Sequence, residues 1–270
     1  MSVVYHLHET TVNPAVLKWW LKAVARLCAS RCVYVSHFLQ KAEPLNGVPA
    51  HVVHNCLPAA FTRRARAFVE KGSRQHNRFT VLMLCSLKAY KGVDTYVALA
   101  GRMPEFTFVL VLNADWDAIS SYFDMQQLPE NLVIFPSAPS VHEFYQEADV
   151  VVNLSHPDRW VETFGMTLLE GMAYGLPVIA PPVGGPTEIV HNGFNGFLID
   201  ARQPEELEGR LRQMATDSAL YRKLSANALR TASRFDFEEF SRQVVTVAER
   251  TLPQRMAATT EALLKASAGT

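Results

Sequence analysis

Short apolar runs alternate with helical stretches through the second half of the chain. β-Branched and aromatic residues predict strands at 79–85, 106–112, 131–135, 149–154, 177–180 and 196–199, and helical periodicity falls between them at 92–102, 116–126, 141–148, 165–174 and 185–191. Continuous apolar strands are typical of a parallel sheet that helices cover on both faces. We therefore predict an α/β fold whose ligands bind at the carboxyl ends of the strands, where Ser86, Pro136 and residues 155–162 fall.

The first 60 residues show the same alternation. The pattern predicts a buried strand at 3–9, further strands at 33–36 and 51–54, and helices at 14–28 and 37–43. Asn13 and Pro14 suit the N-cap and first position of the earlier helix. One face of that helix carries Leu17, Trp20, Leu21, Val24 and Leu27, and the opposite side carries Lys18, Lys22 and Arg26.

The basic side of this helix has two interpretations. Basic side chains beside Trp19 suit contact with an anionic lipid surface, which would place the protein peripherally at a membrane. An ordinary amphipathic helix with a solvated charged face explains the same pattern and is favoured.

The remaining segments define the domain organisation. Residues 62–78 are rich in arginine and predict a linker or an exposed helix. Helices are predicted at 204–215, 217–234 and 236–250, and Asp236 with Glu239, like Ser140 with Glu143, has the spacing of a capping box. We expect a partial domain at 1–60, a linker at 61–78, a second domain at 79–235, and a helix with a loose tail at 236–270.

Composition narrows the class of protein. Lysine plus arginine equals aspartate plus glutamate, at 26 each, so no overall field favours nucleic acid as a partner. Cys28, Cys32, Cys56 and Cys85 lack metal-ligand spacing and indicate a reducing compartment. The start has no basic, apolar leader, and no stretch approaches the roughly 20 apolar residues of a membrane span. We expect a soluble, cytoplasmic protein.

Two carboxylates mark the candidate site. Glu170 is the one charged residue between Thr163 and Thr187, and Glu162 precedes it with seven residues between them. Phe164 and Gly165 begin a short helix here, whose first-turn N–H groups and dipole favour a phosphate. The alternative is a buried helix whose single Glu pairs with a distant cation, and the residues by themselves leave both interpretations open.

The sequence around these carboxylates resembles that of a known family. The spacing of Glu162 and Glu170 matches the E-x7-E signature of retaining glycosyltransferases with the two-domain GT-B fold, of the family 4 type. The resemblance continues through the E-T-F-G block, the E-G-M-A-Y-G-L-P-V-I-A block, the glycine loop before Glu188, and the segment 192–198. The segment 1–60 resembles the last part of that fold's first Rossmann-like domain, and Val35 to Phe38 match its V-S-x-F element. The segment 236–250 resembles the helix that crosses back onto the first domain.

The resemblance implies a role for each site residue. Glu170 would bind the ribose of a nucleotide-sugar donor, and Glu162 would bind the sugar hydroxyls. Lys91, together with backbone N–H groups at Thr163, Phe164, Gly165 and Met166, would bind the diphosphate. His8, followed by Glu9, matches a histidine near the transferred sugar, although a lone histidine at a strand end is more often structural. His156 and Asp158 precede Glu162 and are weaker candidates.

The chain also departs from the family. Ser86 stands where the family has an arginine that neutralises the diphosphate, so Lys88 would have to compensate. Several βα units that would precede His6 are absent. The sequence is therefore compatible with a fragment, with a reduced relative, or with an enzyme whose first domain is completed by a partner chain.

These observations predict a glycosyltransferase that moves a sugar from a nucleotide-sugar to an acceptor hydroxyl with retention of configuration. The acceptor could be a glycan, a lipid-linked sugar or a small molecule, and no metal or cofactor is expected. The alternative is a nucleotide-sugar-binding protein without its own turnover. An unrelated dinucleotide oxidoreductase is disfavoured because no G-x-G-x-x-G follows a strand.

Overall fold

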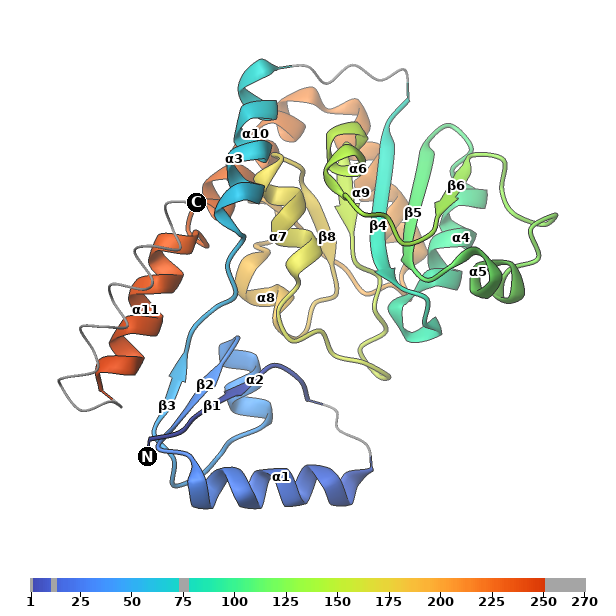
Figure 1. Ribbon diagram of the computed structural model, residues 1–270. Coiled ribbons are helices and arrows are strands. Elements are labelled where there is room, and N and C mark those ends of the chain that lie inside the picture. The colour runs from blue at the N-terminus through green and yellow to red at the C-terminus, as the bar shows by residue number, and fades with distance from the viewer. Residues whose placement is uncertain (1, 11–13, 73–77, 251–270) are drawn as a thin grey trace. The chain divides into compact units, whose positions relative to one another are not determined.

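The chain forms two compact units (Figure 1). The computed structural model describes residues 2–10, 14–72 and 78–250. Unit 1 comprises residues 1–61 and 234–270, and unit 2 comprises residues 62–233. Within the described ranges, no helix is long and apolar enough to cross a membrane.

Unit 2 is built on a parallel sheet of six strands in the order β6-β5-β4-β7-β8-β9. The strands are β4 (Thr80–Ser86), β5 (Thr107–Asn113), β6 (Leu132–Phe135), β7 (Val150–Val152), β8 (Val178–Ala180) and β9 (Gly196–Leu198). All six strands predicted for this region are confirmed. In this order the winding direction reverses between β4 and β7, and ligands of such sheets bind at the carboxyl ends beside that reversal.

Helices cover both faces of this sheet (Figure 1). One face packs against α4 (Val93–Arg102) and α9 (Pro204–Thr216), whose apolar residues share a core with Met83, Leu110 and Val152. The other face packs against α6 (His142–Glu147) and α7 (Met166–Ala173). The remaining elements are α3 (Ala59–Lys71), which begins in unit 1, the 3-10 helix η1 (Ala89–Lys91), α5 (Trp116–Tyr122), α8 (Pro186–Ile189) and α10 (Ser218–Ala232).

Of the two structures predicted for the basic segment, the exposed helix is the one found, whereas the start of α6 differs from its prediction. The basic segment is a helix, α3, in which Arg63, Arg64 and Arg66 are exposed, and it ends at Lys71. The N-cap of α6 is Val141 rather than Ser140, because Ser140 Oγ donates to Glu143 Oε2 at 2.6 Å instead of bonding a backbone N–H group. Residues 73–77 and the tail after Arg250 lie outside the described residues.

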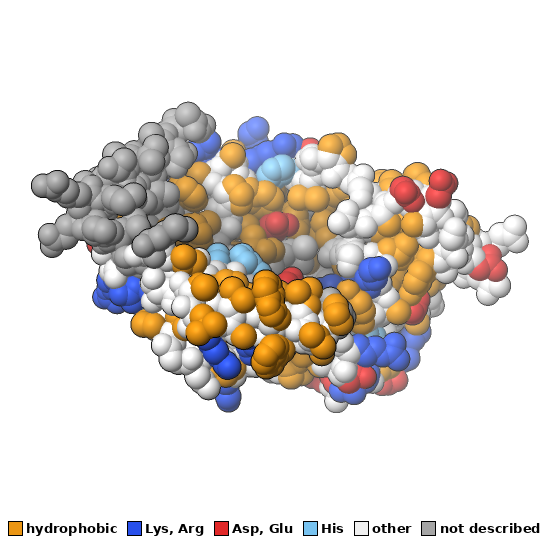
Figure 2. All heavy atoms as spheres, turned by 60° about the horizontal axis from the view of Figure 1, so that its bottom comes forward, with side chains coloured by type: hydrophobic (Ala, Val, Ile, Leu, Met, Phe, Trp, Pro, Cys, Tyr) orange, Lys and Arg blue, Asp and Glu red, His pale blue; other side chains and the backbone are white. Residues whose placement is uncertain are grey.

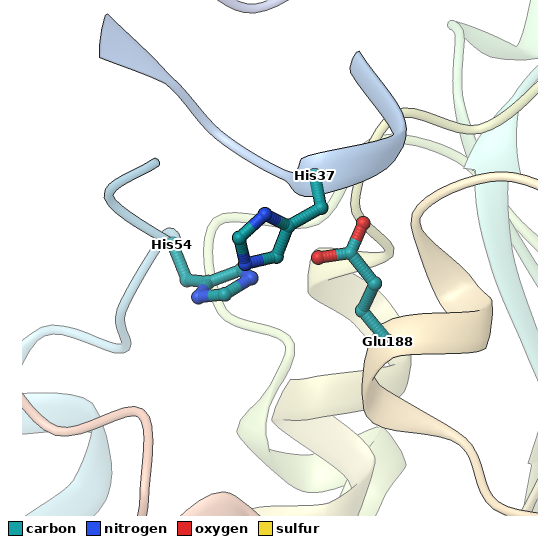
Figure 3. A group of neighbouring side chains, drawn as sticks. All are labelled: His37, His54 and Glu188. Atoms are coloured by element: carbon teal, nitrogen blue, oxygen red, sulfur yellow. The ribbon is translucent and has the colours of Figure 1, made fainter. Parts of the chain in front are cut away.

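Unit 1 holds a parallel sheet of three strands, β1 (Val4–Leu7), β2 (Arg31–Tyr34) and β3 (Ala50–Val52), in that order. None of the four residues of β1 is buried, so the prediction of a buried strand there is wrong: β1 lies at the edge of the described sheet. The helix α2 (His37–Ala42) follows β2. The ring of His37 meets that of His54 edge to face, with centroids 5.6 Å apart (Figure 3).

The last described helix, α11 (Phe237–Glu249), packs on this small sheet. Val247 shares a core with Val33 of β2 and Val53 after β3. Asp236 caps the helix by accepting from the Glu239 N–H group at 2.8 Å, as its spacing predicted. The whole of unit 2 separates Val33 and Val53 from Val247 along the sequence, so α11 returns to unit 1.

The helix α1 (Ala15–Cys28) lies with its predicted faces largely reversed, because two of the three predicted basic residues point inward. Lys18 and Lys22 turn toward the rest of unit 1, where their ammonium groups contact the two carboxylate oxygens of Glu43 at 2.5 and 2.8 Å. Large apolar side chains are exposed and gather along the helix in Figure 2: Val16 at 75%, Leu17 at 41%, Trp19 at 70%, Trp20 at 54% and Leu27 at 87%. Arg26, the third residue of the predicted basic side, stays exposed as expected.

The reversal of α1 has an electrostatic cause. The buried carboxylate of Glu43 requires cationic partners, and the two lysines supply them. Burial by itself would raise the pKa of Glu43, but the hydrogen bonds and charges of Lys18 and Lys22 outweigh it and hold that pKa below its usual value. The N-cap of α1 is Pro14, and the predicted cap Asn13 lies outside the described residues.

Candidate functional site

A cavity of about 280 Å³ opens at the carboxyl ends of β4 and β5. Its wall is mainly apolar with a few polar groups, which is the composition typical of small-molecule sites. The lining residues are Leu84, Cys85, Val111, Leu112, Asn113, Ser137, Ala138, Val141, Thr167 and Glu170. Burial raises the pKa of the Cys85 thiol to about 12, so this group stays neutral at physiological pH.

Glu170 provides the carboxylate of this cavity. It lies in the middle of α7, and the hydroxyl of Tyr145 donates to its Oε2 at 2.5 Å. Burial raises the pKa of Glu170, and the hydrogen bond from Tyr145 opposes that rise. The interpretation of Glu170 as a buried residue paired with a distant cation is not supported, because its described partner is a neutral hydroxyl.

The second carboxylate, Glu162, lies in the loop before α7 and pairs with Lys91. The ammonium group of Lys91 is 2.9 Å from Glu162 Oε2, and Asn153 Nδ2 donates to the same oxygen at 3.3 Å. The side chains of Lys91 and Glu162 are 16% and 19% exposed. The loop after β4 and the loop after β7 therefore meet through a partly buried ion pair, at the reversal of the sheet.

Lys91 is also held by aromatic rings. Its ammonium group lies 5.2 Å from the centroid of the Trp160 ring, which stacks on Tyr90 at 5.3 Å. Ser86, where the family has arginine, is the last residue of β4, and Lys88 nearby is exposed. Of the two lysines in this loop, Lys91 is the one held in place beside Glu162, and Lys88 is exposed.

Glycines allow the Glu162 loop to pack closely. Gly165, the N-cap of α7, has a φ of 110°, a region that favours glycine. A Cβ on Gly185 would lie 2.1 Å from the carbonyl oxygen of Thr163, and the Gly185 N–H group donates to the carbonyl of Glu162 at 2.8 Å. The glycine loop thus supports the backbone that carries Glu162, Thr163 and Phe164.

The start of α7 lies between the two carboxylates. Thr163, Phe164 and Gly165 are buried and Met166 is half-buried. The first N–H groups of any α-helix have no acceptor within the helix, and its dipole is positive there. The residues predicted to bind a diphosphate are consequently placed together with Glu162 and Lys91 in unit 2.

The other predicted residues take separate places. His8 lies in unit 1, exposed, with its Nε2 3.2 Å from His6 Nδ1. His156 Nε2 is 3.2 Å from Thr95 Oγ1, which connects its loop to α4. Glu188 belongs to α8 of unit 2 (Figure 3).

The segment 192–198 has a structural role. Asn195 is fully buried, and its amide nitrogen donates to the Ile189 carbonyl at 2.8 Å and to Thr231 Oγ1 at 2.9 Å. Its oxygen accepts from the His191 N–H group at 2.8 Å. The asparagine thus joins the end of α8 to α10, and we assign it no contact with a ligand.

Several site residues were missed by sequence reasoning. Tyr145 and Asn153 hold the two glutamates, and Asn113 and Ser137 form a polar pair in the cavity, with Ser137 Oγ 2.9 Å from Asn113 Oδ1. A signal existed for Asn113 and Ser137, because each lies at or just beyond the carboxyl end of a predicted strand. Tyr145 gave none, because an apolar helix position fits a tyrosine in any core.

The family model for glycosyl transferases group 1 matches residues 65–231, which include every site residue of unit 2 named above. The chain belongs to this family. The D-inositol 3-phosphate glycosyltransferase of Acidothermus cellulolyticus is 34% identical over 199 residues, covering 68% of this chain and 43% of that protein. The sucrose synthase of Melioribacter roseus is 38% identical over 93 residues, 33% of this chain and 12% of that protein. The chain thus spans less than half of either relative.

Solved structures confirm the α/β, GT-B-like fold. Anabaena HepE, crystallised with UDP and glucose, superposes with a TM-score of 0.77 at 22% identity, covering 92% of this chain and 71% of that chain. The sucrose-phosphate synthase of Thermosynechococcus elongatus gives a TM-score of 0.75 at 19% identity, over 92% and 67%. The C-terminal domain of a group 1 family protein from Francisella tularensis gives 0.52 at 20%, over 68% and 97%.

Proposed function

We propose that this chain transfers a sugar from a nucleoside-diphosphate sugar to an acceptor hydroxyl, with retention of the anomeric configuration. One observation carries the proposal: the sheet ends in a cavity containing Glu170, beside a helix N-terminus that lies next to the Glu162–Lys91 pair. The family membership and the UDP bound to HepE support the same assignment.

Each group has a role in this reaction. The base enters the mainly apolar cavity, and the carboxylate of Glu170 accepts hydrogen bonds from the ribose hydroxyls. The first turn of α7 and Lys91 receive the diphosphate, whose negative charge grows as the bond to the sugar breaks. Glu162 accepts from the sugar hydroxyls and keeps Lys91 oriented. Because these groups supply the positive charge, we expect transfer to persist in excess EDTA.

Calorimetric titration with UDP-glucose, GDP-mannose and ADP-glucose tests the donor site. We expect one of these nucleotides to bind tightly to the wild type, and Glu170→Ala to weaken that binding by roughly 10- to 100-fold, because hydrogen bonds to a charged group are worth about 1.5–3 kcal/mol. Glu206→Ala removes the same charge from an exposed position on α9 and should change nothing. Equal effects of the two variants, or no binding by the folded wild type, would exclude the proposal.

A second candidate function is binding of a nucleotide-sugar without turnover. Ser86 supplies no positive charge, and the nearest fixed cation, Lys91, is already paired with Glu162. Product analysis separates the two functions: NMR of a donor incubated with glycan and small-sugar acceptors should show a new anomeric signal of the donor's own configuration. Tight donor binding with no product from any acceptor would favour the binding protein.

A further inference from the structure

We propose that Tyr145 is a positioning residue for Glu170: its buried hydroxyl holds one carboxylate oxygen, so that the other is presented to the ribose. The inference rests on the proposed function, because it concerns the same nucleotide. Tyr145 is 0% exposed on α6, and its Oη donates to Glu170 Oε2 at 2.5 Å. Within the described part of the chain, Glu170 Oε1 has no hydrogen-bond partner, and Glu170 lines the cavity.

The surroundings of Tyr145 keep its hydroxyl in place. Its ring stacks on Tyr174, with centroids 5.6 Å apart and planes 15° apart. Gly171 brings α7 close to the sheet and to this ring, since a Cβ there would lie 2.6 Å from Val151 and 3.8 Å from Tyr145. The carbonyl of Thr167 is 3.4 Å from the same hydroxyl, but the single proton goes to the much closer carboxylate.

The protonation states suit this role. Burial, and then the charge of Glu170, raise the pKa of Tyr145 well above its ordinary value, so its hydroxyl remains a donor. A free glutamate side chain has three torsions that become ordered when a ligand binds. In a glutamate that is already hydrogen-bonded, fewer of these torsions are still free before binding. Tyr145 therefore reduces the entropy lost on binding and favours the ionised form of Glu170.

The pH dependence of binding belongs to a small set of groups. Among the residues that line the cavity, Glu170 and Cys85 are titratable, and the pKa of Cys85, at about 12, keeps it neutral. Tyr145 faces Glu170 from α6 and also stays neutral. Glu162 is a second carboxylate that contacts the donor in the proposed function, so the part of the acid limb that depends on the Tyr145 hydroxyl is the part that belongs to Glu170. Removing the Tyr145 hydroxyl raises the pKa of Glu170 further, and the acid limb moves to higher pH.

Tyr145→Phe tests the inference, and Tyr174→Phe is the matched control. Tyr174 is also buried and aromatic, but its hydroxyl pairs with His142 Nδ1 at 2.5 Å rather than with Glu170. Binding of UDP-glucose, GDP-mannose and ADP-glucose would be measured from pH 4.5 to 8 with wild type, both variants and Glu170→Gln. We expect Tyr145→Phe to weaken binding about three- to tenfold at pH 7 and to move the acid limb upward, with neither change in the control.

A measurement without ligand makes the test independent of the donor. Carbon-13 NMR of the glutamate carboxyl groups, assigned with Glu170→Gln, should show Glu170 titrating at higher pH in Tyr145→Phe than in wild type or Tyr174→Phe. Unchanged titration and an unchanged acid limb would overturn the positioning role, even if Glu170→Gln abolishes donor binding. Failure of all three sugar nucleotides to bind the wild type would overturn the role together with the proposed function.

Discussion

At the scale of single residues, the site depends on positions where no side chain fits. Gly185 has an ordinary helical backbone, with φ at −57°, so its requirement for glycine comes from contact alone. The carbonyl oxygen of Thr163 occupies the space a Cβ would need. Gly185 therefore supports the loop that carries Glu162, and this role requires no contact between Gly185 and a ligand.

Gly185→Ala should destabilise the protein. Because the Cβ would lie 2.1 Å from backbone atoms that cannot rotate away, we expect a loss of about 1–3 kcal/mol in the free energy of unfolding. Gly209→Ala in α9 is the control: no atom lies within 4 Å of its added Cβ, so it should be neutral or gain up to about 1 kcal/mol. Urea unfolding measures both, and a neutral Gly185→Ala would contradict the packing described for this loop.

At the scale of elements, α1 shows that amphipathic periodicity defines two faces without deciding which face is buried. The periodicity predicted a solvated basic side, but Glu43 draws Lys18 and Lys22 inward. The tryptophans are exposed as a result. Contact of this helix with a lipid surface stays a prediction.

Glu43→Gln should destabilise the protein in a pH-dependent manner. At pH 7 the charged partner of both lysines is lost, and we expect a cost of about 1–3 kcal/mol. The folded-state pKa of Glu43 lies below its usual value, so its contribution is complete above roughly pH 5 and disappears as the pH falls through that lowered pKa. The difference between wild type and variant should shrink accordingly between pH 7 and pH 3.5.

The same substitution at an exposed ion pair is the control for Glu43. Glu70 pairs with Arg66 across one turn of α3, with both side chains largely solvated. Such pairs contribute about 0.3–0.5 kcal/mol, so Glu70→Gln should have little effect at any pH. If the difference between Glu43→Gln and wild type stayed constant with pH, the ion-pair account of the orientation of α1 would be wrong.

At the scale of the whole molecule, the candidate donor site belongs to one unit. Every residue that lines the cavity, and the Glu162–Lys91 pair, fall within residues 62–233. His8, predicted to act on the sugar, lies in unit 1. Donor binding should therefore need unit 2 alone, whereas transfer should also need unit 1, which carries His8.

A fragment of residues 59–233, which keeps α3 whole, should fold and bind the donor. We expect cooperative urea unfolding and a nucleotide affinity within about threefold of the full chain, because no lining residue is removed. The fragment should make no product, since the chain that carries His8 is missing. A folded fragment that cannot bind would show that the donor site needs unit 1. If the fragment binds a nucleotide at the cavity, Glu170→Ala in the fragment should weaken that binding.

The sequence determined the local features of this protein and its family. The apolar runs predicted the six strands of unit 2, because a strand buried on both faces leaves few polar positions, and the Glu162–Glu170 blocks identified the family. Only the tertiary structure decided the pairings between distant segments: Lys91 with Glu162, Tyr145 with Glu170, and the lysines of α1 with Glu43. Such partners lie up to 71 residues apart, and periodicity within one element says nothing about which neighbour supplies the opposite group. Packing decides which carboxylates are buried, and a buried carboxylate needs a hydrogen-bond or ion-pair partner. The partner of each glutamate therefore follows from the tertiary structure.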